Sequence, residues 1–119
     1  MKKTCALLEA AVSCGSPTTG TERAFDDLTA HGAAALLGDA ALCPMEKTDP
    51  GPVGDPDLRH LDAVMAVSRT LRANMLTALE KGRFPVVIGG DHSIAMGSLA
   101  ARGEHYGAEN VGLIYIDAH

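Results

Sequence analysis

The sequence contains no tryptophan and only two tyrosines and two phenylalanines among its 119 residues. Hydrophobic residues nevertheless make up 46% of the chain, which is typical of a globular protein. A core can therefore form, but it has to be built from leucine, valine, isoleucine, methionine and alanine. The length is that of one domain at most, so we expect residues 1–119 to belong to a single domain.

Basic residues are also scarce. Ten lysines and arginines face fifteen aspartates and glutamates, giving a net charge of −5, and no basic stripe runs along the sequence. This pattern excludes the electrostatic footprint of a nucleic-acid-binding protein, and we expect no nucleic-acid partner. The three cysteines, Cys5, Cys14 and Cys43, form no CxxC pair. They are typical of free thiols in a reducing compartment rather than of a disulfide framework or zinc site, so we expect a cytoplasmic protein.

Long hydrophobic runs are missing as well. At the N-terminus, Lys2 and Lys3 followed by the apolar residues 5–12 resemble a short signal peptide. Glu9 interrupts this run, however, and the run is far too short to cross a bilayer. We therefore expect a buried first strand over residues 4–13 and no membrane partner.

The remaining pattern alternates between helix and strand signals. After a glycine- and proline-containing turn, a short helix is predicted over residues 21–31, followed by a loop over 38–55 that could hold a brief strand at 40–43. The clearest helix is predicted over 56–81, where apolar residues recur every three or four positions. Its expected N-cap, first residue and stop are Asp55, Pro56 and Gly82.

The sequence PVVIGGDHS, residues 85–93, predicts a strand that is buried on both faces, as in a parallel sheet. Gly89 and Gly90 allow a sharp turn at the carboxyl end of this strand. A helix over 93–102 and a further apolar strand over 111–116 complete a strand–helix–strand unit, which is right-handed in nearly all proteins. The predicted fold class is therefore α/β, a parallel sheet with flanking helices.

Polar triplets follow both of these strands: Asp-His-Ser at 91–93 and Asp-Ala-His at 117–119. Ligands of open α/β sheets bind at the carboxyl ends of the strands. If the two strands are neighbours, their ends lie about 5 Å apart, and His92, Asp117 and His119 could converge. Alternation along an extended chain also puts Asp117 and His119 on the same side.

Imidazole and carboxylate groups suit manganese, iron, zinc or nickel. A bridging Asp117 would suit a binuclear site, in which a hydroxide held between two ions is nucleophilic at neutral pH, and Asp91 is expected to orient a ligand. Two alternatives stay open. The triplets could be caps and loop residues, or the glycine pair could form a phosphate loop, although neither GxGxxG nor P-loop spacing is present. Three further histidines lack partners at useful spacing and are expected at the surface: His31, His60 and His105.

The segments VVIGGDHSIAMGSLAA and GLIYIDAH closely resemble the ureohydrolase family, which comprises arginases, agmatinases and formiminoglutamases. The resemblance covers most of the chain and is strongest over residues 62–119. The sequence IAMGS at 94–98 is similar to the arginase branch, whose motif continues with a glycine–serine pair. The resemblance implies an arginase-like three-layer α/β/α fold and a centre with two manganese ions.

By motif match, the resemblance implies that His92 binds one manganese ion and His119 the other, with Asp117 bridging both. A metal-bridging hydroxide would then hydrolyse the guanidinium group of L-arginine to L-ornithine and urea. The implied partners are a small guanidino substrate and other copies of the chain, because members of the family commonly form trimers or hexamers.

The chain departs from the family pattern in two places. Ala24, Phe25 and Thr29 replace the usual Gly-Pro and later arginine. The further aspartate after DAH, a DxD pair, the substrate-holding serine and asparagine and a later histidine are also absent. Because each manganese prefers about five or six donors, three side chains cannot hold two ions. We therefore expect residues 1–119 to be a single incomplete arginase-like domain, truncated, with an exposed last strand and no activity alone. The alternatives are an agmatinase or formiminoglutamase, or a non-catalytic remnant or interaction fragment.

Overall fold

The sheet consists of three parallel strands. The computed structural model describes residues 3–118, and its strands are β1 (Cys5–Ala10), β2 (Ala41–Cys43) and β3 (Phe84–Gly89), in the order β2-β1-β3. The central strand, β1, pairs in parallel with both neighbours, so that Leu7 lies opposite Leu42 and Val86. The predicted parallel sheet is confirmed, with a first strand slightly shorter than residues 4–13.

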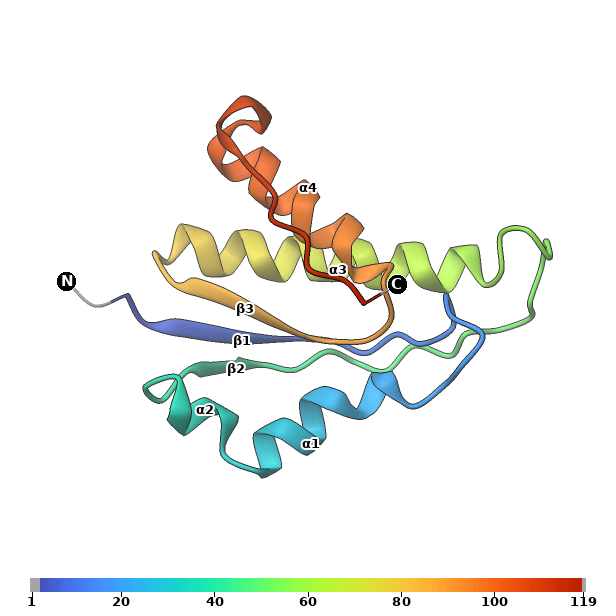
Figure 1. Ribbon diagram of the computed structural model, residues 1–119, viewed down its shortest axis with the longest axis horizontal. Coiled ribbons are helices and arrows are strands. Elements are labelled where there is room, and N and C mark those ends of the chain that lie inside the picture. Colours follow the sequence, from blue (N-terminus) through green and yellow to red (C-terminus); the bar gives the residue numbers. More distant parts are fainter. Residues whose placement is uncertain (1–2, 119) are drawn as a thin grey trace.

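Helices cover both faces of this sheet (Figure 1). On one face lie α1 (Ala24–Ala30) and α2 (Ala33–Leu36), and on the other lie α3 (Leu61–Glu80) and α4 (Ile94–Tyr106). Two single-turn 3-10 helices, Thr21–Arg23 and Ala108–Asn110, precede α1 and follow α4. This is the three-layer α/β/α arrangement that the sequence predicts.

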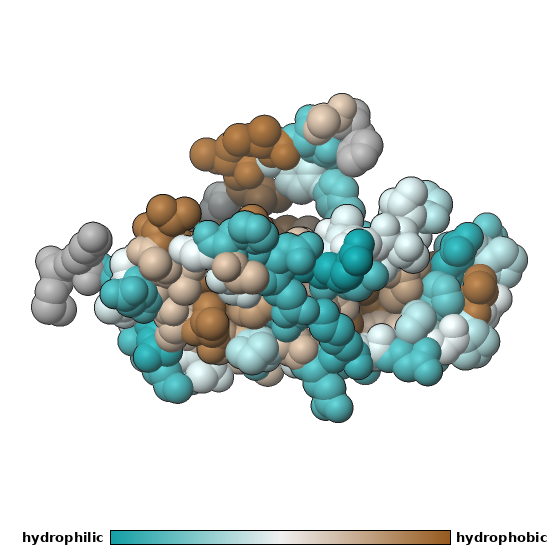
Figure 2. All heavy atoms as spheres, turned by 90° about the horizontal axis from the view of Figure 1, so that it is seen from below, coloured by the Kyte–Doolittle hydropathy of each residue, from teal (hydrophilic) through white to brown (hydrophobic). Residues whose placement is uncertain are grey.

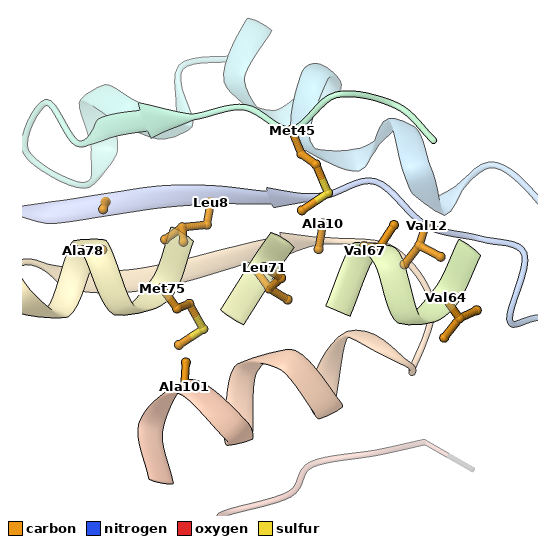
Figure 3. Close-up of a cluster of buried hydrophobic side chains, with 11 residues drawn as sticks. Leu8, Ala10, Val12, Met45, Val64, Val67, Leu71, Met75, Ala78 and Ala101 are labelled. Carbon is orange, nitrogen blue, oxygen red and sulfur yellow. The ribbon is translucent and has the colours of Figure 1, made fainter. Parts of the chain in front are cut away.

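The core is aliphatic, as the shortage of aromatic residues requires. Side chains of β1 alternate between the two faces. Leu8 packs with Leu71 and Met75 of α3 (Figure 3), whereas Leu7 packs with Phe25 of α1 on the other face. Leu7, Leu8, Leu71 and Met75 are the largest fully buried side chains. Each such burial stabilises the fold by about 2 kcal/mol, and β1 is thereby held rigidly at the centre of the sheet.

The long helix begins later than predicted. α3 starts at Leu61 rather than at Pro56. His60 adopts a left-handed φ of 50°, which a continuous α-helix cannot include, and its N–H donates to Val53 O at 2.9 Å. The Asp55 carboxylate, predicted to cap the helix, instead accepts the backbone N–H two residues later at 2.8 Å. Asp55 therefore stabilises a turn in the loop. α4 in turn ends at Tyr106, beyond residue 102, where the predicted helix ends.

Residues 111–116, predicted as a strand, join no sheet in the part of the chain that the structure describes. The segment is extended and runs back along α4 (Figure 1). Ile114 and Ile116 are 89% and 95% exposed, and hydrophobic side chains gather on the projecting part of the molecule (Figure 2). The prediction of a strand at 111–116 is therefore wrong, because an apolar extended segment becomes a strand only with a hydrogen-bonded neighbour. The predicted strand–helix–strand unit is therefore wrong for residues 3–118, and β3 is an edge strand there.

Within residues 3–118, no helix is both long enough and hydrophobic enough to span a membrane.

Candidate metal centre

The ends of β1 and β3 approach each other so closely that only glycine fits between them. Ala10, the last residue of β1, pairs with Gly89, the last residue of β3. A Cβ atom on Gly89 would lie 2.4 Å from Ala10 O, and one on Gly90 would lie 2.4 Å from the same atom and 2.5 Å from Val12 O. Gly90 also has a φ of 63°, which glycine adopts without strain. The glycine pair thus places the β3–α4 turn directly beside the loop that follows β1.

Asp91 joins these two segments. Its N–H donates to Val12 O at 2.8 Å, and its Oδ2 accepts the N–H of Gly15 at 2.8 Å. Its Oδ1 accepts the N–H of Ser93 at 2.9 Å and also the Ser93 hydroxyl. The carboxylate therefore ties the turn to the loop after β1 and supports the first turn of α4. The prediction that Asp91 orients a neighbouring ligand remains open, because these bonds go to Gly15 and Ser93.

His92 lies at the exposed tip of this turn, at the carboxyl edge of the sheet. Its ring stacks on the ring of Tyr115, with centroids 5.3 Å apart and planes inclined by 13°. Tyr115 belongs to the C-terminal segment, which therefore returns to the end of β3 (Figure 1). Asp117 follows two residues later and is also exposed. His119 lies outside the described residues.

The C-terminal segment thus reaches the sheet edge by a route that the sequence did not indicate. The C-terminal segment comes to His92 along α4, not as a neighbouring strand. The donors available from His92 and Asp117, an imidazole nitrogen and carboxylate oxygens, are of the types that bind manganese and similar divalent ions. Within residues 3–118, however, no group of three or more His, Cys, Asp or Glu side chains could hold an ion. The described residues supply only part of a donor set, and the assignment of His92, Asp117 and His119 stays a prediction.

The other histidines have local roles. His31 Nδ1 donates to Asp27 O at 2.7 Å, and His60 Nδ1 donates to Pro50 O at 3.1 Å. The ring of His105 meets the ring of Tyr106 edge-on at 4.6 Å. His31 and His105 are exposed and His60 is half-buried. Each of these side chains therefore has a partner within its own helix or loop.

Glu9 carries a buried carboxylate, and the sequence pattern indicated it only as an interruption of the apolar run at residues 5–12. Glu9 in β1 is 2% exposed, and its Oε2 accepts the N–H of Met45 at 2.8 Å. Its Oε1 has no hydrogen-bond partner in the described part of the chain and lies 3.9 Å from Lys47 Nζ. Lys47 also binds Asp26 Oδ2 at 2.7 Å. The signal that could have revealed this role was a single acidic residue inside an apolar strand, because a buried carboxylate is costly unless it is hydrogen-bonded or paired.

Two groups that follow β1 have a shifted pKa: Cys14 in the loop, and Glu22 in the 3-10 helix Thr21–Arg23. Burial, and then the negative charge of Asp91, raise the pKa of the Cys14 thiol. Hydrogen bonds from Ser13 and from the backbone lower the pKa of Glu22, whose carboxylate accepts the N–H of Gly20 at 2.7 Å. The thiol is thus kept neutral and the carboxylate is kept ionised at neutral pH.

Comparison with known proteins relates this geometry to one family. The family model described as the arginase family matches residues 3–119. The arginase of Bacillus caldovelox is 48% identical over 66 residues, which are 56% of this chain and 21% of that protein. The arginase of Bacillus subtilis strain 168 is 43% identical over 65 residues, which are 55% of this chain and 21% of that protein.

The similarity extends to solved structures. A crystal structure of arginase from Bacillus subtilis is similar with a TM-score of 0.78 and 28% identity, over 99% of this chain and 39% of that one. A structure of arginase from Bacillus cereus is similar with a TM-score of 0.66 and 26% identity, over 88% of this chain and 36% of that one. The match thus spans 21% of the length of these curated relatives and 39% of the Bacillus subtilis structure.

Proposed function

The chain belongs to the arginase family, and from this premise we propose that it forms the N-terminal portion of a manganese-dependent ureohydrolase that converts L-arginine to L-ornithine and urea. The observation that carries the proposal is the position of His92. It lies at the carboxyl edge of the parallel sheet, on a turn held by Asp91, with the C-terminal segment stacked against it through Tyr115. Ligand sites of α/β sheets form at this edge.

The proposed roles of the residues follow from their positions. His92 would bind one manganese ion, His119 the other, and Asp117 would bridge both. When bound, the ions act as Lewis acids that make water a nucleophile at neutral pH. The chain itself contributes orientation: the glycine pair brings His92 to the sheet edge, and the stacked Tyr115 limits rotation of the imidazole. The acidic chain, with a net charge of −5, also attracts a cationic guanidinium substrate.

The proposal can be tested in two steps. The purified 119-residue chain should release no measurable urea from arginine with added manganese, because residues 3–118 supply only part of a donor set. A chimaera that continues this chain with the rest of the Bacillus caldovelox arginase should release urea, and should do so faster from arginine than from agmatine or formiminoglutamate. Clear turnover by the 119-residue chain would contradict the first step.

The chimaera also tests the assignment of the ligands. His92→Ala should abolish urea release and weaken manganese binding by more than the roughly 10- to 100-fold that loss of an outer-shell partner costs. His31→Ala, on an exposed histidine of the first helical region, should leave both unchanged. Equal manganese affinity in the two variants, measured by calorimetric titration of the folded proteins, would contradict the assignment of His92 as a manganese ligand. A folded chimaera that binds manganese but acts only on agmatine or formiminoglutamate would transfer the proposal to that branch of the family.

A second candidate, a non-catalytic interaction fragment, is favoured by one observation. The C-terminal segment exposes Leu113, Ile114, Tyr115 and Ile116 together, and contiguous apolar surface of this kind marks interaction sites. A measurement of manganese binding distinguishes the two candidates, because only the enzyme proposal requires manganese to bind at His92.

A further inference from the structure

We propose that Asp91 is a positioning residue for the imidazole of His92. Its carboxylate and its N–H clasp the β3–α4 turn to the loop after β1, and this clasp fixes where the imidazole lies at the sheet edge. That the imidazole binds a metal ion rests on the proposed function. That Asp91 holds it in place rests on the contacts of Asp91 alone.

The first argument is the position of the hydrogen bonds. Asp91 precedes His92 and Ser93 follows it, and the N–H of Ser93 donates to Asp91 Oδ1 at 2.9 Å. On the other side, the Asp91 N–H donates to Val12 O, and Asp91 Oδ2 accepts the N–H of Gly15, both at 2.8 Å. Gly15 is 76 residues away in the sequence, so this bond joins two distant segments. His92 is therefore anchored on both sides by one neighbouring side chain.

The second argument is the close packing of the loop against the turn. A Cβ atom on Gly15 would lie 2.9 Å from Asp91 Oδ2, and one on Gly90 would lie 2.5 Å from Val12 O. Both contacts are shorter than real Cβ contacts allow. Glycine thus occurs on each side of the clasp, where a side chain would push Asp91 away from its partners.

The third argument is the chemistry of the carboxylate. The carboxylate accepts three hydrogen bonds, from the N–H groups of Gly15 and Ser93 and from the Ser93 hydroxyl. An ionised carboxylate has two acceptor oxygens, whereas an amide has only one and presents an NH₂ group in place of the other. Asparagine at position 91 would therefore lose the bonds on one side. Its bonds would also lack the added strength that the charge provides.

The test follows amide exchange at Gly15 and Ser93 and the ring signals of His92 in the 119-residue chain, and manganese affinity in the chimaera. Asp91→Asn should accelerate exchange at Gly15 or Ser93 by at least roughly tenfold and shift the His92 ring signals. In the chimaera, the same substitution should lower the manganese affinity by roughly 10- to 100-fold. Asp49→Asn is the matched control, because Asp49 Oδ1 also accepts the N–H two residues later, at 2.9 Å, but in an exposed loop.

Two further variants separate positioning from a general loss of stability. Gly15→Ala should disturb the clasp from the opposite loop and change the His92 ring signals in the same direction as Asp91→Asn. Leu79→Ala, in the buried face of α3, should lower the free energy of unfolding while leaving the ring signals of the folded chain unchanged. If Asp91→Asn does not fold, Gly15→Ala and Ser93→Ala decide the question with the same observables.

The outcomes are distinct. Unchanged His92 ring signals and unchanged exchange at Gly15 and Ser93 in folded Asp91→Asn would overturn the proposal. Displaced ring signals would support it. If that displacement occurs while the chimaera with an intact His92 binds no manganese, the positioning role is supported and the proposed function loses its metal ligand.

Discussion

At the scale of single residues, Glu9 is the most unusual position in the fold. It places a carboxylate in the central strand with 2% exposure, where an unpaired polar group is costly. The N–H of Met45 binds one oxygen, and Lys47 lies 3.9 Å from the other. Lys47 is itself half exposed and also binds Asp26, so the charge of Glu9 is only partly compensated. The bond to Met45 therefore makes the firmer contribution, because it holds the loop after β2 against β1.

Substitutions of Glu9 should separate the hydrogen bond from the charge. Glu9→Gln retains a side-chain oxygen for the Met45 N–H and should change the free energy of unfolding by less than about 1 kcal/mol. Glu9→Ala leaves that N–H buried without a partner and opens a small cavity, so it should cost about 2–4 kcal/mol. Urea denaturation followed by circular dichroism measures both values. Glu46→Ala, a neighbouring exposed glutamate, is the control and should be neutral; equal stability of the Gln and Ala variants would contradict this role of Glu9.

At the scale of elements, the contact between α3 and α4 determines how the β3–α4 turn continues into the fold. α4 crosses α3 where the buried Gly97 meets Ser68, and a Cβ atom on Gly97 would lie 2.5 Å from Ser68 O. The missing side chain lets the two helix backbones approach each other closely. Because α4 begins directly after the turn that carries His92, this contact also fixes the direction in which the turn leaves the sheet.

Two alanine substitutions in α4 should therefore have opposite effects. Gly97→Ala forces the helices apart and should lower the free energy of unfolding by about 1–3 kcal/mol, despite the better helix propensity of alanine. Gly103→Ala is the matched control in the same helix. Its Cβ would have no contact closer than 3.9 Å, so it should raise stability by about 0.5–1 kcal/mol. Thermal unfolding checks both values, and a stabilising Gly97→Ala would show that the close approach is not required.

At the scale of the whole molecule, the C-terminal segment is the least integrated part. A pocket of 610 Å³ separates residues of this segment from α4, and four of its large hydrophobic residues are more than half exposed. β3 meanwhile has one edge without a strand partner among residues 3–118. Exposed apolar strands and unpaired sheet edges promote association between chains.

We expect the 119-residue chain to self-associate with increasing concentration, and the C-terminal segment to be responsible. The double variant Ile114→Lys/Ile116→Lys changes two side chains that are 89% and 95% exposed, so it should reduce association without unfolding the chain. Leu36→Lys, at an 86% exposed leucine in α2, is the matched control and should associate like the unmodified chain. Light scattering coupled to size-exclusion chromatography measures the mass. A concentration-independent monomer of the unmodified chain would refute the expectation.

Much of the fold was determined by local sequence patterns. The apolar run around Leu7 and Leu8 predicted β1, and the three- to four-residue spacing of apolar positions predicted α3. The glycine pair before Asp91 predicted a sharp turn at the end of β3. These features depend on backbone conformation and on which face of an element is apolar, and neighbouring residues specify both.

Other features depended on partners far away in the sequence, and only the tertiary structure decided them. The apolar pattern at 111–116 is that of a strand, but whether such a segment pairs with β3 or lies along α4 depends on where α4 and its following turn direct the chain. Glu9 looked like an interruption until the loop after β2 supplied its partner Met45. In the same way, the role of Asp91 became visible only when the fold brought Gly15 to its carboxylate. The sequence by itself determined which residues carry donor groups suited to a metal ion, because donor chemistry belongs to each side chain. The tertiary structure decided that the C-terminal segment reaches His92 through Tyr115, because contacts between distant segments determine that geometry.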